Sequence, residues 1–290
     1  MPVPTLGVVA RPQLPPERLR SVVEAADAVG LDEMWLWEDC FLPGGIAASA
    51  MALSWSSRLT VGLGLLPVPL RNPALAAMEL ATLCRAFPGR FRFGLGHGVQ
   101  EWMEQIGARP ASPMTLLHDY VVAVRGLLAG ETVTSRGSYV HLTEVALDWP
   151  PPKTPPILVG ASGPNTLALA GAVGDGTTMT AGTSTSRLRW AREHIDRGRA
   201  EAGRTDPHPI VLYLLATTDA VTPERAAAEK LGDDVDDLVI AGDAHSVAAG
   251  VRRRVSAGAD TVVLQPFADE PDMEGFVRFV GEEVAPLVHA

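Results

Sequence analysis

The stretch "LTVGLGLLPVPLRNPALAAMELATLCRAFPGRFRFGLGHG", residues 59–98, contains two apolar runs with a helical pattern between them. The first run, 59–66, has the length of a strand, and so does the second, 90–96. The pattern between them predicts a helix over about 73–86. Strands that are apolar on both faces and are joined by a helix are typical of a parallel sheet.

The same alternation continues through the chain in both directions. Further strands are predicted at 6–10, 33–37, 156–161, 175–182, 209–218 and 260–267. Further helices are predicted at 15–30, 44–57, 112–130, 163–174, 186–203, 222–231, 245–257 and 273–288. The helix over 112–130 has a cap, a first-turn proline and an apolar stripe, formed by Ser112, Pro113, Leu117, Val121, Val124 and Leu128.

Eight strand–helix units most simply close into a (β/α)8 TIM barrel, and we expect a single domain over residues 1–290. A polar stretch at 131–142, "ETVTSRGSYVHL", predicts a short hairpin-like insertion between units four and five. An open doubly wound sheet is the alternative. It is disfavoured because no G-x-G-x-x-G follows the first strand, where a dinucleotide-binding fold has it.

Composition excludes several classes of function. The formal net charge of −10 gives no sign of the basic face that nucleic acid or an anionic membrane requires. The two cysteines, Cys40 and Cys84, make a disulfide framework improbable, which favours the cytoplasm. We see no signal peptide and no apolar run that spans a bilayer. The seven histidines form no helical pair, so no metal site is predicted.

Ligands of such barrels bind at the carboxyl ends of the strands. Gly94, Gly96 and Gly98 alternate at one of these ends, around His97. Glycines at these positions leave one side of the strand end without side chains, which gives a flat surface for a planar ring. The competing interpretation is that the glycines only allow tight packing of the barrel. His97 itself is a candidate for proton transfer or a hydrogen-bonded core residue.

A second strand end, "GASGP" at 160–164, leads directly into a predicted helix. Its backbone amides and the helix dipole suit a phosphate, while an ordinary helix start capped by Ser162 or Asn165 is the competing interpretation.

Another strand end, "WEDC" at 37–40, follows the second predicted strand and carries two acids and a thiol. Glu38 and Asp39 are candidates for catalysis, or else caps of the next helix. Cys40 lacks identifiable partners for nucleophilic catalysis, so we expect a structural thiol.

Together, "EDCF" (38–41), the segment 62–98, "ILVGASGP" (157–164) and "GDGTTM" (174–179) resemble the bacterial-luciferase-like flavin-dependent oxidoreductases. The likeness is greatest to the branch that contains methylenetetrahydromethanopterin reductase and its deazaflavin-dependent relatives. It implies a barrel that holds coenzyme F420 or FMN, with the ring across the barrel mouth. Relatives often have Asp-His where this chain has Asp39-Cys40, which removes a histidine near the ring.

The resemblance assigns roles to particular residues. The family's acid at the second strand end matches Asp39, so the catalytic candidates are Asp39, Glu38 and His97. The resemblance also implies a non-proline cis peptide between Gly64 and Leu65. The cofactor-binding residues that it implies are Asp39, Gly64, Leu65, Gly96, His97, Gly98, Gly160, Ala161, Ser162, Gly163 and Pro164, with the phosphate at the last five.

Three functions are consistent with these observations. The first is hydride transfer between F420 and a small organic substrate, and the second is an FMN monooxygenase that uses O2 and a partner flavin reductase. The third is a barrel that binds a flavin without turnover, or an unrelated barrel lyase or hydrolase. The substrate pocket is expected among the loops 40–48, 99–113 and 180–186. The family commonly forms homodimers.

Overall fold

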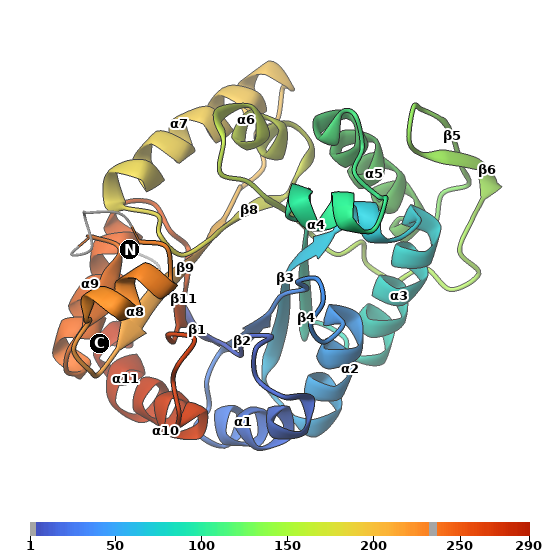
Figure 1. Ribbon diagram of the computed structural model, residues 1–290. Helices are drawn as coiled ribbons and strands as arrows, with labels where there is room; N and C mark the ends of the chain where they lie inside the picture. Colours follow the sequence, from blue (N-terminus) through green and yellow to red (C-terminus); the bar gives the residue numbers. More distant parts are fainter. Residues whose placement is uncertain (1–3, 232–236) are drawn as a thin grey trace.

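The fold is known from a computed structural model, which describes residues 4–231 and 237–290. Within these residues, eight parallel strands form a closed barrel, surrounded by helices (Figure 1). The barrel strands are β1 (Thr5–Val9), β2 (Glu33–Leu36), β3 (Thr60–Pro67), β4 (Phe91–Gly96), β7 (Ile157–Gly160), β8 (Gly176–Met179), β9 (Ile210–Thr217) and β11 (Thr261–Gln265). The predicted TIM barrel is therefore confirmed, and the doubly wound alternative is wrong.

The register shows how the sheet closes on itself. β1 lies between β2 and β11, with Thr5 opposite Thr261. β9 pairs with β11 on one edge and with β8 on the other, where Thr177 lies opposite Ile210. Closure leaves no long unpaired edge, and it explains why the strands are apolar on both faces.

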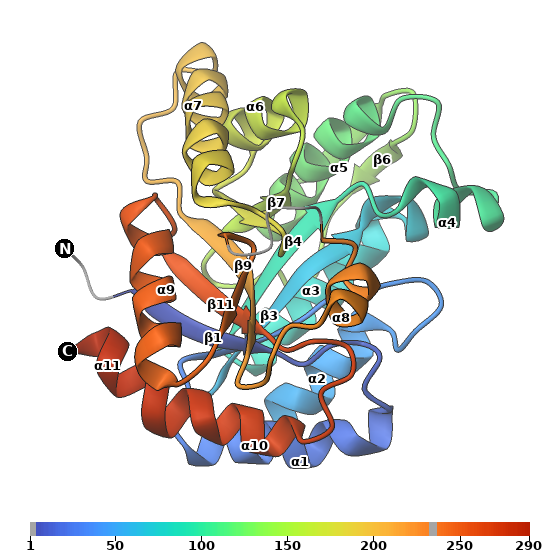
Figure 2. The same ribbon diagram turned by 60° about the vertical axis from the view of Figure 1, so that its left-hand side comes forward.

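The helices cover the outside of the barrel, as the view turned by 60° also shows (Figure 2). Their bounds are α1 (Pro16–Ala28), α2 (Gly45–Trp55), η1 (Val68–Leu70), α3 (Pro73–Ala86), α4 (Gln100–Gln105), α5 (Pro113–Leu128), α6 (Pro164–Val173), α7 (Thr185–Glu201), α8 (Pro223–Ala228), α9 (Ala244–Ser256), α10 (Met273–Arg278), η3 (Phe279–Val284) and α11 (Ala285–His289). α5 begins as predicted, since the Ser112 side chain accepts a hydrogen bond from the Thr115 amide. Its predicted stripe is buried in full.

The insertion between units four and five is the expected hairpin. β5 (Val133–Arg136) and β6 (His141–Val145) pair antiparallel, and they stand outside the ring of helices beside α5 (Figure 1). One further strand was not predicted. β10 (Val239–Ala241) adds in parallel to the carboxyl end of β9, between α8 and α9.

A polar cluster occupies the amino end of the barrel, away from the strand ends that carry the predicted site. His208 is buried there, and its Nε2 lies 2.8 Å from the Thr177 hydroxyl. Burial and the neighbouring cations of Arg199, Arg192 and Arg204 lower the pKa of His208 to about 4.

None of the helices within the described ranges is long and apolar enough to cross a membrane.

Candidate active site

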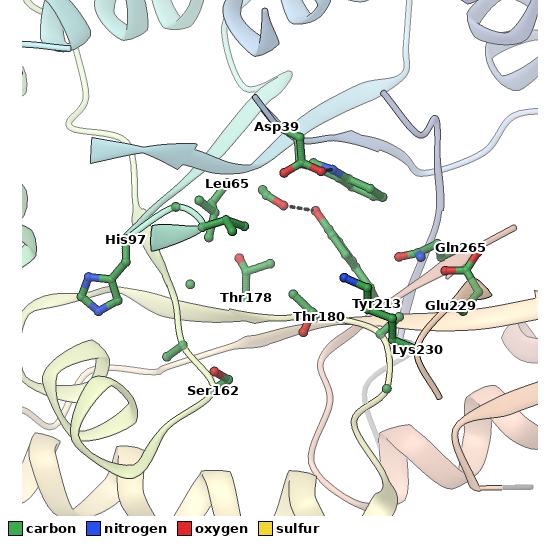
Figure 3. A pocket seen from close by; sticks show the side chains of 18 of the residues that line it. Asp39, Leu65, His97, Ser162, Thr178, Thr180, Tyr213, Glu229, Lys230 and Gln265 are labelled. Carbon is green, nitrogen blue, oxygen red and sulfur yellow. Dashed lines mark hydrogen bonds between the residues drawn. The ribbon is translucent and has the colours of Figure 1, made fainter. Parts of the chain in front are cut away.

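A cavity of about 730 Å³ opens at the carboxyl ends of the barrel strands. Figure 3 shows its side chains, with His97 at one end and Gln265, Glu229 and Lys230 at the other. The described residues that line it are Trp37, Glu38, Asp39, Gly64, Leu65, His97, Gly98, Val99, Gly160, Ala161, Ser162, Thr166, Thr178, Thr180, Ala181, Gly182, Tyr213, Leu215, Glu229, Lys230, Leu231, Leu238 and Gln265. Its size suits a ligand as large as a cofactor ring with a substrate.

Asp39 follows β2 and faces this cavity. The Trp37 indole donates a hydrogen bond of 2.8 Å to one carboxylate oxygen of Asp39. Burial raises the pKa of Asp39, although the Trp37 hydrogen bond and the positive charge of Arg11 counter part of this shift. A carboxyl group that is partly desolvated and held by one donor is suited to keep or release a proton near a reacting atom.

Glu38 has a structural environment, although it precedes Asp39 directly. Its carboxylate accepts two hydrogen bonds from Arg71, of 2.8 and 3.1 Å, and a third of 2.8 Å from the Gly45 amide at the start of α2. The side chain of Glu38 is only 7% exposed. Because Arg71 and the helix start occupy its oxygens, the expected catalytic role of Glu38 is not supported, and we assign it to holding the loop between β2 and α2.

Leu65 occupies the space that two glycines, Gly96 of β4 and Gly160 of β7, leave open. A Cβ atom on Gly96 would lie 2.4 Å from a Leu65 methyl carbon, and one on Gly160 would lie 2.2 Å from the same carbon. Gly96 was expected to line the cavity. It does not, because it makes room for the Leu65 side chain instead. The surface that faces the cavity here is the Leu65 side chain itself.

The backbone beneath Leu65 is irregular. The Gly64–Leu65 peptide is cis, as the resemblance implies, and the Cys40–Phe41 peptide is cis as well, which was not expected. The register between β3 and β4 shifts at this point, between Leu63 and Leu66. The Tyr213 hydroxyl, from β9, donates a hydrogen bond of 2.8 Å to the Gly64 carbonyl (Figure 3).

His97 and Gly98 continue from β4 along the cavity wall. Gly98 has a φ of +67°, a left-handed conformation that favours glycine. The Nε2 atom of His97 lies 3.5 Å from the Thr166 hydroxyl of α6. Burial lowers the pKa of His97, so its ring is neutral at ordinary pH.

The loop at 160–164 differs from the expected phosphate cradle in two ways. The Ala161 amide is not free, because it donates a hydrogen bond of 3.2 Å to the Thr178 carbonyl. Gly163 and Pro164 do not line the cavity, and a Cβ on Gly163 would meet open space. The contribution of this loop to the cavity therefore comes from Gly160, Ala161 and Ser162.

The start of α6 also has no side-chain cap. Its N-cap residue is Gly163, so capping by Ser162 or Asn165 is wrong. Uncapped amides at a helix start suit an anion. A cation lies beside them, since Arg187 donates a hydrogen bond of 2.7 Å to the Ser162 carbonyl.

Several lining residues were not singled out from the sequence. Tyr213 lies within an unbroken apolar run of the sequence, where only its hydroxyl group could have indicated a role in the site. Gln265 ends β11, and Thr178 lies one residue before the end of β8, both at the same rim as the predicted strand ends. Thr178 is buried, and its hydroxyl has no hydrogen-bond partner in the described part of the chain.

The expected substrate loops contribute unevenly. Val99 and the turn at 180–182 line the cavity, but no residue from 40–48 does. Burial and the neighbouring carboxylates of Glu38 and Asp39 raise the pKa of the Cys40 thiol. Cys40 is therefore a poor nucleophile, as predicted.

Comparison with known proteins agrees with this architecture. The luciferase-like monooxygenase family matches residues 5–231. The chain is 27% identical over 244 residues to a 5,10-methylenetetrahydromethanopterin reductase of Methanolobus tindarius, covering 84% of this chain and 73% of that protein. It is 28% identical over 321 residues to an F420-dependent glucose-6-phosphate dehydrogenase of Microbacterium testaceum, covering 94% of both.

A solved structure shares the whole fold. The F420-dependent secondary alcohol dehydrogenase in complex with an F420-acetone adduct superposes with a TM-score of 0.87 at 22% identity, covering 99% of both chains. The barrel with its hairpin insertion, the cavity at the strand ends and the match over 5–231 lead to one conclusion: the chain belongs to the luciferase-like monooxygenase family of oxidoreductases.

Proposed function

We propose that this protein is an F420-dependent oxidoreductase that transfers a hydride between F420 and a small organic substrate. The observation that carries the proposal is an apolar shelf at the barrel mouth, the side chain of Leu65, in a cavity that the polar side chains of Asp39 and Thr180 also line. The names of the relatives favour F420 over FMN, because several of them are F420-dependent enzymes.

The cavity fits a planar ring that carries a phosphate-bearing chain. Small residues, Gly64, Gly98, Gly160 and Ala161, keep its walls close to the backbone. The uncapped start of α6, with Ser162 and Thr166 on the cavity wall, suits the phosphate.

F420, when bound, supplies the two-electron chemistry, and the protein supplies orientation, a dry surface and a proton route. Leu65 would support one face of the ring and exclude water from it. Tyr213 holds the Gly64 carbonyl, so it keeps Leu65 in position. The Asp39 carboxyl group would keep or release a proton near the reacting atoms, and Trp37 fixes the orientation of that group.

The proposal is tested by separate titrations of the purified protein with F420 and with FMN. We expect F420 to bind and FMN to bind much more weakly, as followed by the fluorescence of each cofactor. A panel of alcohols, aldehydes and ketones is then screened for oxidation or reduction of F420. If only FMN binds, the assignment to F420 is wrong.

An FMN monooxygenase is the second candidate, and the match to luciferase-like monooxygenases favours it. It would need O2 and a partner flavin reductase as the source of electrons. Oxygen consumption in the presence of FMN and an added flavin reductase identifies this activity. Tight binding of either cofactor, without turnover of any substrate in the panel, would favour a barrel that only binds flavin.

A further inference from the structure

The end of the cavity opposite His97 contains a cation on an unusual backbone. Lys230 lines the cavity, and it is the only Lys or Arg among the described residues that do so. Figure 3 shows its side chain directed from the backbone toward the cavity, near Tyr213. The chain has only one other lysine, Lys153, which is exposed and outside the cavity.

Lys230 lies two residues after the last residue of α8, in a position that favours glycine. Its amide donates a hydrogen bond to the Ala227 carbonyl, and the Leu231 amide donates one to the Ala226 carbonyl. This pair of hydrogen bonds is the Schellman motif, in which the left-handed residue is usually glycine. Lys230 has a φ of +56°. Strain of this kind at a cavity wall points to a role for the side chain.

The position of Lys230 is fixed by its neighbour. The Glu229 carboxylate accepts a hydrogen bond of 2.6 Å from Arg11, which follows β1, and one of 2.9 Å from the Ala268 amide, which follows β11. These contacts tie the end of α8 to the barrel mouth. They also engage the negative charge of Glu229 with Arg11, so Glu229 does not neutralise Lys230.

The cavity that Lys230 lines combines a polar amide with apolar side chains. Gln265 presents an amide from the end of β11, and Leu215, Leu231 and Leu238 present apolar side chains. An ammonium group beside an amide binds a carboxylate or a phosphate, and the leucines suit a hydrocarbon chain.

We infer that Lys230 and Gln265 hold an anionic group of the substrate, a carboxylate or a phosphate, while the remainder of the substrate reaches toward Asp39. This inference rests on the proposed function, because the ring and its phosphate are placed at Leu65 and the start of α6. The substrate is then an apolar molecule with an anion at one end and its reactive carbon at the other.

The two lysines allow a direct test. Reductive methylation with ¹³C-formaldehyde labels Lys153, Lys230 and the terminal amine and keeps their charge, so each gives a separate NMR signal. Hexanoate, hexyl phosphate and hexanol are the probes, added with and without F420. We expect saturable shifts of the Lys230 signal by hexanoate or hexyl phosphate, none by hexanol, and no shift of Lys153. The tighter of the two anions identifies the chemistry of the substrate.

Variants complete the test. Lys230→Met should weaken binding of the better anion by about tenfold, as measured by calorimetry. Lys230→Arg should retain it, and Lys153→Met is the matched control that should leave it unchanged. All three should keep their affinity for F420 within about twofold. The inference is overturned if neither anion shifts the Lys230 signal, or if Lys230→Met weakens F420 instead. If F420 does not bind the wild type at all, the proposed function fails while the anion result stands by itself.

Discussion

The Tyr213 hydroxyl and the Gly64 carbonyl, 149 residues apart in the chain, form a hydrogen bond of 2.8 Å beneath the proposed cofactor site. Tyr213 is fully buried, and its ring packs edge-on against Trp35 at a centroid distance of 6.0 Å. The floor of the cavity is therefore held by a contact between β3 and β9, on opposite sides of the barrel.

Tyr213→Phe removes this contact without changing the packing of the ring. The buried Gly64 carbonyl loses its partner, so we expect the free energy of unfolding to fall by about 1–2 kcal/mol. F420 affinity should fall as well, because Leu65 follows Gly64. Urea denaturation and F420 titration measure the two effects. Unchanged F420 affinity in a destabilised variant would show that Tyr213 has only a structural role.

Gly96→Ala should displace Leu65, because the new Cβ would lie 2.4 Å from a Leu65 methyl carbon. We expect F420 affinity to fall by about tenfold, corresponding to about 1.4 kcal/mol. Gly44→Ala is the matched control, since Gly44 lies outside the cavity lining, has a φ of −63° and would bring its Cβ no closer than 4.0 Å to another atom. The double variant Gly96→Ala/Leu65→Ala should recover thermal stability but not affinity. A single Gly96→Ala variant with normal affinity would contradict the role of Leu65.

Asp39→Asn should lower turnover strongly and stability little. The side chain faces the cavity and is held by one hydrogen bond from Trp37, so few structural contacts are lost. Because burial raises the pKa of Asp39, the wild-type rate should show an ionisation above the usual range of an aspartate. This ionisation should be missing from the pH profile of the variant. Its persistence would assign it to another group.

Glu38→Gln, at the adjacent position, should have the opposite effect and lower stability more than turnover. It leaves the partly buried Arg71 with only its ion pair to Glu79, in which Nε lies 3.4 Å from the carboxylate, so we expect the free energy of unfolding to fall by roughly 1–3 kcal/mol. Differential scanning calorimetry should therefore show a lower melting temperature, and Glu38→Gln/Arg71→Met should recover part of the loss. A stable Glu38→Gln variant without activity would restore Glu38 as a catalytic residue.

Stability should fall below neutral pH because of His208. Its pKa is about 4 in the folded protein and about 6.5 when unfolded, so the unfolded chain binds more protons between these values. The free energy of unfolding should decrease by roughly 3 kcal/mol at most as the pH falls through this window. In His208→Gln this decrease should be smaller, as urea denaturation at pH 4 to 7 can measure. An identical pH dependence would rule out His208.

The barrel was predictable because local signals agreed along most of the chain. The cap at Ser112 and the stripe from Leu117 to Leu128 each depend on neighbours within a few residues. β10 was missed because three residues are too short for a periodic signal, and its pairing depends on β9.

The site was less predictable, because its contacts join distant strands. The sequence shows that Gly96 has no side chain, but not that Leu65 of β3 fills the space. Glu38 and Arg71 pair across 33 residues, so the acid appeared free in the sequence. Lys230 carried one usable signal, its rarity in a chain with only two lysines.

The pairing of β1 with β11 has a consequence for synthesis of the protein on the ribosome. β1 can pair with β2 early in synthesis. Its second neighbour, β11, becomes available only when residues 261–265 emerge from the ribosome. Until then the nascent sheet keeps two open edges, β1 and β9, and such edges invite pairing with other chains. Any delay before residues 261–265 leave the ribosome therefore exposes the nascent chain to aggregation.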